Sequence, residues 1–227
     1  MSDSTRNATV TRYSEADVPT EYGTLRMIVY RQAGTDHEHV AIVAGTVSGK
    51  SDVLVRVHSE CLTGEVLHSL KCDCREQLDL ALRRIVEAGE GAVLYLRQEG
   101  RGIGLGNKIK AYALQSQGYD TVDANRALGF EDDLRRYDVA ARMLEDLGIE
   151  SVRLMTNNPS KVEALRADGV NVAGRVEHLV EPHAHNRGYL ESKKARMGHV
   201  YDLTRFSIAP GRAAAPFDLF PRRKFAR

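Results

Sequence analysis

The chain has 227 residues, of which 42% are hydrophobic and 28% are charged, and its 32 Lys and Arg residues nearly balance its 31 Asp and Glu residues. This balance gives no indication of a nucleic-acid-binding protein. No segment approaches the roughly 20 apolar residues of a membrane span, and the polar N-terminus lacks the apolar core of a signal peptide. We therefore expect a cytoplasmic protein that binds neither nucleic acid nor a membrane.

The hydrophobic pattern alternates between strand-like and helix-like segments. In chain order, the sequence predicts a flexible segment at 1–12, strands at 25–30, 39–47 and 53–58, a helix at 74–89, a strand at 91–98, helices at 107–118 and 134–148, a strand at 151–156, a helix at 159–169, a strand at 170–178 and a helix at 189–197. This alternation predicts a single α/β (mixed α+β) domain at 13–200 with a mixed sheet flanked by helices. A tail is expected at 201–227.

Two of the predicted helices carry an apolar stripe at helical spacing and end at a glycine, which is typical of a helix stop. The stripes comprise Leu78, Ala81, Leu82 and Ile85 in the first helix and Ala140, Met143, Leu144 and Leu147 in the second. Asp132 and Asp133 precede the second stripe, so we expect them at a helix start, where carboxylates act as caps or favour the helix dipole.

The cysteines form one group. All three lie in the pattern C-x10-C-x-C, as Cys61, Cys72 and Cys74. An odd number cannot pair fully, and disulfides rarely persist in the cytoplasm. Three protein ligands suit a catalytic zinc with an open fourth position, whereas a structural zinc would need a fourth ligand, for which His58 and His68 are candidates. The pattern favours a metal site, with inert core thiols and a redox pair as alternatives.

A zinc with an open position lowers the pKa of bound water toward about 7, which indicates hydrolysis. The segment HSEC at 58–61 partly matches the H-x-E half of the zinc nucleobase deaminase signature. The second half of that signature is missing, because C-x-C stands in place of P-C-x-x-C. A deaminase is therefore an alternative to another zinc hydrolase.

Two further segments have the pattern of anion-binding loops. The glycines at 100, 102, 104 and 106 precede a helix but match neither the P-loop nor the dinucleotide fingerprint. Backbone N–H groups at such a helix start bind anions, and a flexible turn explains the pattern equally well. Asn158 and Pro159 are typical of a helix N-terminus that can hold phosphate, although an ordinary capped helix is the preferred interpretation there.

Five segments together resemble the GTP cyclohydrolase II family, and they lie at 56–78, 95–115, 118–130, 153–165 and 193–199. The resemblance implies an α/β homodimer that uses zinc and magnesium. It also implies hydrolysis of GTP to formate, diphosphate and 2,5-diamino-6-hydroxy-4-(5-phosphoribosylamino)pyrimidine, the first step of riboflavin biosynthesis or of a related specialised pathway. A non-catalytic GTP-binding relative remains an alternative.

The resemblance also implies roles for individual residues. Cys61, Cys72 and Cys74 would hold one zinc ion per subunit. The GTP site would comprise Arg56, Val57, His58, Ser59, Glu60, Gln77, Glu99, Gly100, Arg101, Thr121, Thr156 and Lys161.

Three residues would be catalytic in the family. Asp133 matches the proposed proton acceptor, Arg135 the proposed nucleophile toward the α-phosphate, and Tyr112 a tyrosine near the purine that ring opening needs. Because a guanidinium is protonated at neutral pH, Arg135 can instead stabilise charge at the α-phosphate. A tyrosine at position 112 implies full ring opening with release of formate.

Overall fold

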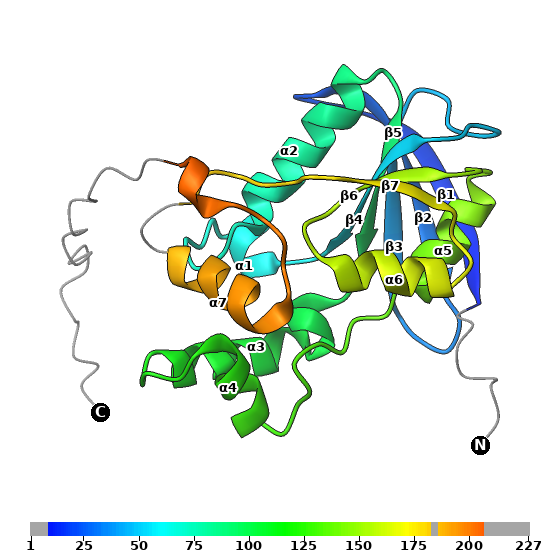
Figure 1. Cartoon of the computed structure of the whole chain (residues 1–227). Helices are drawn as coiled ribbons and strands as arrows, with labels where there is room; N and C mark the ends of the chain where they lie inside the picture. The colour runs from blue at the N-terminus through cyan, green and yellow to red at the C-terminus, as the bar shows by residue number, and fades with distance from the viewer. Residues whose placement is uncertain (1–8, 183–185, 207–227) are drawn as a thin grey trace.

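The structure is a computed structural model that describes residues 9–182 and 186–206. A mixed seven-stranded sheet with the order β1-β2-β3-β5-β4-β6-β7 forms its centre (Figure 1). The strands are β1 (Val10–Thr20), β2 (Gly23–Gln32), β3 (Glu38–Ala44), β4 (Val53–Ser59), β5 (Gly91–Leu96), β6 (Val152–Met155) and β7 (Val172–Val176). β1, β2, β3 and β5 pair antiparallel, whereas β5, β4, β6 and β7 run parallel.

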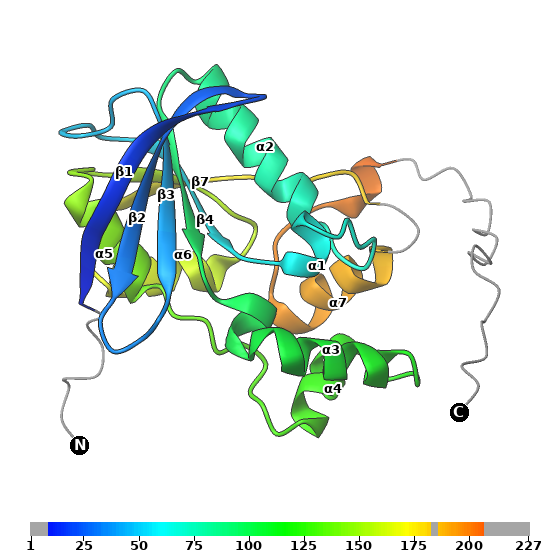
Figure 2. The ribbon, with the colours of Figure 1, turned by 180° about the vertical axis from the view of Figure 1, so that it is seen from behind.

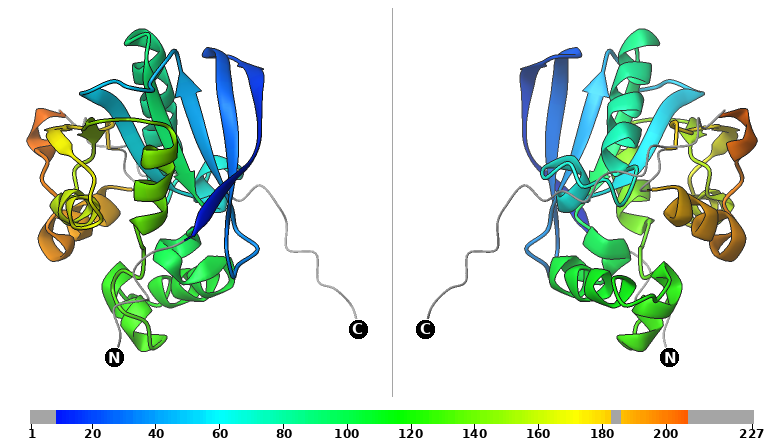
Figure 3. Two further views of the ribbon diagram at one scale, coloured as in Figure 1. Left: turned by 90° about the vertical axis from the view of Figure 1, so that its right-hand side faces the viewer. Right: turned by 90° about the vertical axis from the view of Figure 1, so that its left-hand side faces the viewer.

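The helices cover the two faces of this sheet and leave one end of its parallel strands available for ligand binding. They are α1 (Leu62–Glu65), α2 (Cys74–Glu87), α3 (Gly104–Gln115), α4 (Thr121–Ala127), α5 (Asp138–Asp146), α6 (Pro159–Ala167) and α7 (Arg187–Met197), with 3-10 turns η2 (Glu99–Gly102) and η3 (Leu203–Arg205). α2 covers one face of the sheet, and α5 and α6 cover the other (Figures 1 and 2). Figure 3 shows α3 and α4 in green below the sheet, where β5 leads into them.

The two faces of the sheet bury separate apolar clusters, and both predicted stripes lie in them. On α2, Ala81 and Ile85 are fully buried, and Leu78 and Leu82 pack beside them. On α5 and just beyond it, the four stripe residues are all buried: Ala140, Met143, Leu144 and Leu147. β4 is buried along almost its whole length, as expected of a central parallel strand covered on both faces. The predicted mixed α/β domain is thus confirmed.

The sequence pattern missed β1, α1 and α4. β1 is a mostly exposed edge strand with few apolar residues, so its side chains carry little hydrophobic signal, although it pairs with β2 from Val10 to Thr20. Its first three residues lie in the segment predicted to be flexible, while 1–8 lie outside the described residues. At the other end, Tyr201 is buried and donates a hydrogen bond to the Leu190 carbonyl, so the predicted tail begins with packed residues. The rest of that tail, 207–227, lies outside the described residues.

The prediction that Asp132 and Asp133 stand at a helix start is wrong, because α5 begins only at Asp138. The preceding segment instead passes over residues 100–106, the glycine loop, where the backbone N–H of Leu134 donates to the Arg101 carbonyl at 3.1 Å.

Across the two described ranges, no helix combines the length and apolarity that crossing a bilayer requires.

The connections of two neighbouring parallel strands decide where a cavity can form. β4 leads through α1 to α2 on one face, and β6 leads to α6 on the other. When adjacent parallel strands send their chains to opposite faces, a crevice opens outside their carboxyl ends, and ligands bind there in open α/β sheets.

Candidate functional site

A cavity of about 510 Å³ lies in this position, within the usual size range of small-molecule sites. It is lined by the carboxyl ends of β4 and β6, by the loop after β5, and by α2, α3 and the C-terminal segment. Sixteen of the eighteen residues proposed for the site line this one cavity: Arg56, His58, Ser59, Glu60, Cys61, Cys72, Cys74, Gln77, Glu99, Gly100, Arg101, Tyr112, Thr121, Arg135, Thr156 and Lys161.

The other two proposed residues do not line the cavity. Val57 is fully buried in the apolar cluster beneath α5 and α6, because successive side chains of a strand point to opposite faces. Its carbonyl, however, accepts a hydrogen bond from Lys161 Nζ at 2.8 Å. Asp133 stands behind Arg135, and its two carboxylate oxygens accept hydrogen bonds from that guanidinium. Val57 thus contributes its backbone carbonyl and not its side chain to this region, and Asp133 reaches the cavity only through its partner Arg135.

Cys61, Cys72 and Cys74 form the thiol cluster, in which the three Sγ atoms lie within 4.8 Å of one another. Cys61 precedes α1, Cys72 lies in the turn before α2, and Cys74 is the first residue of α2. Cys61 Sγ and Cys72 Sγ are 3.6 Å apart. Two sulfurs bound at about 2.3 Å to one tetrahedral zinc would lie about 3.8 Å apart. The three thiols are free cysteines, and their spacing fits a shared metal ion such as zinc.

Gly64 lies beside the thiol cluster, and its lack of a side chain leaves room for the three sulfurs. A Cβ at Gly64 would lie 2.9 Å from Cys72 Sγ and 3.2 Å from Cys61 Sγ. Both distances are shorter than ordinary contacts, so any larger residue would push the sulfurs apart. Glycine at this position therefore keeps the three donors converging on one point.

Charge gives a second test of the fit. Hydrogen bonds with Cys72 and Cys74 lower the pKa of Cys61. The hydrogen bond with Cys61 in turn raises the pKa of Cys72 to about 11 and raises the pKa of Cys74 well above its usual range. The thiols alone thus favour one thiolate, and ionisation of all three requires a cation. The donor set therefore fits a soft divalent ion.

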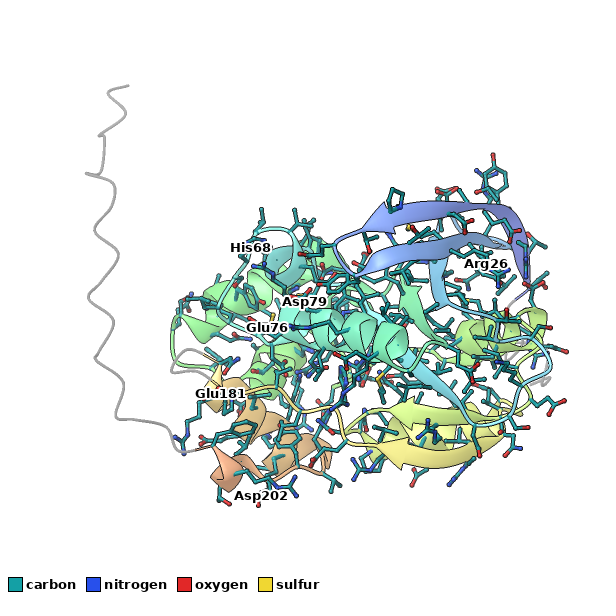
Figure 4. The ribbon with its side chains drawn as sticks, turned by 90° about the horizontal axis from the view of Figure 1, so that it is seen from above. Arg26, His68, Glu76, Asp79, Glu181 and Asp202 are labelled. Carbon is teal, nitrogen blue, oxygen red and sulfur yellow. The ribbon has the colours of Figure 1, made fainter. Side chains whose placement is uncertain are left out.

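Neither histidine joins the thiol cluster as a fourth ligand. His58 Nε2 lies 2.7 Å from Glu65 Oε1, and His68 is exposed at the surface between α1 and α2 (Figure 4). Among the described residues, the group that can hold a metal comprises the three cysteines alone. A metal ion held by these three ligands would keep one coordination position for a further ligand, as in catalytic rather than structural zinc sites.

Two residues of α3 face the thiol cluster. Lys108 Nζ donates to Cys61 Sγ at 3.0 Å and to Glu99 Oε1 at 2.7 Å. Burial opposes its charge, but these two hydrogen bonds raise the pKa of Lys108. One turn later, the Tyr112 hydroxyl lies 3.5 Å from Thr63 Oγ1. Burial raises the pKa of Tyr112 to about 12, so at neutral pH its hydroxyl keeps its proton as a hydrogen-bond donor.

Arg56, Arg135 and Lys161 form the cation cluster of the same cavity. Arg56 and Lys161 are buried, with exposures of 7% and 4%, and neither forms an ion pair with a carboxylate among the described residues. Burial lowers the pKa of Arg56 to about 10, and burial followed by the charge of Arg56 lowers the pKa of Lys161 well below its usual range. Buried cations without counterions are costly, so the cluster suits an anionic ligand.

Hydrogen bonds hold the cation cluster in place. Arg56 Nη1 donates to the Met155 carbonyl at 2.9 Å, and its Nη2 donates to Gln77, which in turn donates to Asp73. Arg56 Nε is buried without a hydrogen-bond partner. A ligand acceptor that reached this atom would complete the hydrogen bonding of the guanidinium.

The glycine loop has a structural task that the sequence pattern did not predict. Gly100, Arg101, Gly102 and Gly104 all have positive φ angles, between 61° and 91°. A Cβ at Gly102 would lie 3.1 Å from Leu134. The loop is thus tightly curled and lets the segment that carries Arg135 approach closely.

Several cavity residues were not singled out as site residues from the sequence: Lys71, Asp73, Lys108, Asn157, Lys193, His199 and Tyr201. Lys108 and Tyr112 are four residues apart, and such pairs share a helix face, so this one could have been found. Lys193 donates to Asp73 across 120 residues at 3.3 Å, and no local pattern predicts such a contact.

The fold and the cavity define an α/β protein with a candidate metal centre beside a buried cationic site. The family model of GTP cyclohydrolase II matches residues 11–177, and the chain belongs to this family.

Curated relatives agree with this membership. "GTP cyclohydrolase-2" of Citrobacter koseri is 53% identical over 83% of this chain and 96% of its own length. "GTP cyclohydrolase-2" of Actinobacillus succinogenes is 52% identical over 85% of this chain and 88% of its own length. "Riboflavin biosynthesis protein RibBA" of Endomicrobium trichonymphae is 50% identical over 81% of this chain, but the match spans only 46% of that longer protein.

Proposed function

We propose that this chain hydrolyses GTP, opens the imidazole ring of its guanine and releases formate and diphosphate. The product would be 2,5-diamino-6-hydroxy-4-(5-phosphoribosylamino)pyrimidine, used in riboflavin biosynthesis or a related pathway. One observation carries the proposal: a thiol cluster with an open position and a cluster of buried cations line the same cavity. The names of the relatives support GTP as the substrate.

The thiol cluster would hold the metal of the reaction. Cys61, Cys72 and Cys74 would bind one zinc ion, which as a Lewis acid makes water a nucleophile at neutral pH. Tyr112 and Thr63 lie beside these sulfurs. The Tyr112 hydroxyl keeps its proton at neutral pH and would donate a hydrogen bond to the opening ring.

The cation cluster would bind the triphosphate. Phosphoryl chemistry depends chiefly on positioning and charge stabilisation, and Arg56 and Lys161 are buried without carboxylate partners among the described residues. Arg135 is held by the carboxylate of Asp133. Burial opposes ionisation of Asp133, but the hydrogen bond from Arg135 lowers its pKa, so both groups are charged at neutral pH. We propose that Arg135 stabilises charge at the α-phosphate and that Asp133 orients it.

Three further features belong to the same proposal. Magnesium would accompany the triphosphate, the chain would form a homodimer, and the enzyme would act in the cytoplasm. The first two follow from the family resemblance, the compartment is the expectation drawn from the sequence pattern, and each is open to direct measurement.

Product analysis tests the function. The protein is incubated with zinc, magnesium and GTP labelled with 13C at C8, and the label is followed by NMR while diphosphate is measured enzymatically. We expect 13C-formate and diphosphate together with a diaminopyrimidine of the corresponding mass. A deaminase would release ammonia and keep the label in the ring, and a non-catalytic relative would return GTP unchanged. Either result would refute the proposal.

A further inference from the structure

Lys108 is a buried residue of the cavity whose ammonium points at a metal-binding sulfur. Its residue exposure is 9%, and it extends from α3 toward the loop that precedes α1. Nζ lies 3.0 Å from Cys61 Sγ and 2.7 Å from Glu99 Oε1.

Both carboxylate oxygens of Glu99 accept hydrogen bonds from the protein in this arrangement. Its Oε1 accepts from Lys108 and from the Gly100 backbone N–H at 2.8 Å, and its Oε2 accepts from the Leu62 backbone N–H at 2.7 Å. The carboxylate therefore ties α1, η2 and α3 together and fixes the ammonium of Lys108. Glu99 thus fixes both Lys108 and the start of α1, next to Cys61, and so holds Lys108 Nζ close to Cys61 Sγ.

The charges explain why an ammonium should stand here. Three thiolates and one divalent ion carry a net charge of −1, and a buried net charge is costly unless it is paired. A hydrogen bond to a ligand atom also tunes the metal from the outer shell. When the hydrogen bond draws electron density from the thiolate, the sulfur donates less to the metal, and the metal stays a stronger Lewis acid.

We propose that Lys108 is a positioning residue of the metal centre, whose hydrogen bond to Cys61 balances the charge of the thiol cluster and weakens the electron donation of that sulfur. The inference rests on the proposed metal site. It concerns how the protein tunes the ion and is independent of the identity of the nucleotide.

The test uses the full chain loaded with Co²⁺, which reports sulfur donation through its thiolate-to-cobalt charge-transfer absorption. Lys108→Met removes the hydrogen bond, and Lys110→Met, an exposed lysine of the same helix, is the matched control. We expect the absorption of K108M to shift to lower energy and that of K110M to match the wild type. Zinc affinity, measured by competition with a chromophoric chelator, should fall about 10-fold in K108M, because the ammonium no longer balances the net negative charge of the three thiolates and the ion.

A double variant guards against a folding defect. K108M leaves the Glu99 carboxylate buried without its cation, so K108M/E99Q removes both charges at once and should show the same shift. If both variants give the wild-type absorption, Lys108 has only a structural role and the inference is overturned. If the wild-type chain binds neither cobalt nor zinc, the metal assignment itself fails, and this outcome is distinct from the first.

Discussion

The thiol cluster and the cation cluster share one cavity but compensate their charges in opposite ways. In the thiol cluster, the ammonium of Lys108 already stands 3.0 Å from Cys61 Sγ. In the cation cluster, Arg56 and Lys161 are buried without a carboxylate partner among the described residues. The thiol cluster is suited to bind one metal cation. The cation cluster has no carboxylate partner for Arg56 and Lys161 among the described residues, so it is suited to bind an anionic ligand. The comparison therefore separates the proposed metal-binding part of the site from the proposed phosphate-binding part.

Removal of a thiol should have the largest effect. Cys72→Ser removes one of the three proposed metal ligands. A Lewis acid contributes several kcal/mol, and each 1.4 kcal/mol is tenfold in rate, so formate release should fall at least about 1,000-fold. Metal content by elemental analysis should fall with it.

The fold should survive this loss. The apolar clusters on both faces of the sheet lie apart from the thiols, so the far-UV circular dichroism and the cooperative thermal transition of C72S should persist. A variant that no longer unfolds cooperatively would show that the metal holds the structure together and would contradict the catalytic assignment.

Replacement of Arg135 tests what the cation cluster does. If Arg135 stabilises charge at the α-phosphate, Arg135→Met should lower kcat/KM for GTP by about 100-fold or more. Arg135→Lys keeps the charge but loses the paired hydrogen bonds with Asp133, so its loss should be about tenfold.

The difference in activity between R135M and R135K decides whether Arg135 acts through its charge or as a nucleophile. Steady-state diphosphate release gives both values, with magnesium held constant. Equal inactivation of R135K and R135M would favour a nucleophilic arginine and contradict the electrostatic role. Metal content should remain that of the wild type in both variants, since Arg135 lies outside the thiol cluster.

The thiol cluster could be predicted from sequence, and the cation cluster could not be derived without the family resemblance. The three cysteines lie within one short segment, and their odd number and their spacing indicate a set of metal ligands. Arg56, Arg135 and Lys161 come from β4, the segment before α5, and α6. Only the sheet order brings them together, because it places β4 beside β6. Periodicity gives the elements of a fold but not the pairing of distant strands.

Errors in the predicted elements have the same physical origin. Buried strands and striped helices were predicted well, because burial imposes an apolar pattern. β1 is mostly exposed, so its long pairing with β2 depends on backbone hydrogen bonds that leave no apolar pattern. The expected helix start at Asp132 and Asp133 failed because Asp133 accepts from the backbone N–H and the guanidinium of Arg135, which a capping pattern does not distinguish.

Lys161 should contribute to ligand binding at the expense of stability. Its folded pKa is lowered well below the usual 10.5, so the unfolded state binds more protons, and stability decreases as the pH falls from about 10.5 toward the folded pKa. Lys161→Met removes this loss. The Tm at about pH 7 should therefore rise above that of the wild type, and the gain should vanish near pH 11, where the lysine is largely neutral in both states.

The same change should weaken GTP binding about tenfold or more, since a hydrogen bond to a charged group contributes about 1.5–3 kcal/mol. A bound phosphate should also raise the pKa of Lys161, so that wild-type binding takes up a proton in the pH range between the free and the bound pKa of this lysine. Above about pH 7 a terminal phosphate is already ionised and does not contribute to this uptake. Calorimetry in buffers of different ionisation enthalpy measures this uptake. It should disappear in K161M and persist in Lys194→Met, which changes an exposed lysine. Equal uptake in both variants would exclude Lys161 as the group that titrates.

The glycine loop gives the smallest expected effect on GTP binding and offers a matched pair of variants. Gly102 has a φ of +91° and would place a Cβ 3.1 Å from Leu134, whereas Gly106 is helical and has nothing within 4 Å of such an atom. A left-handed residue other than glycine costs about 1–2 kcal/mol, so Gly102→Ala should lower Tm by about 2–8 °C. Gly106→Ala should raise it by about 1–4 °C, because alanine is favoured over glycine in a helix by about 0.5–1 kcal/mol.

Since the Gly102 loop also supports the segment that carries Arg135, G102A should raise KM for GTP by a few-fold while G106A leaves it unchanged. Equal thermal shifts in the two variants would mean that the loop does not hold the conformation on which this part of the site depends.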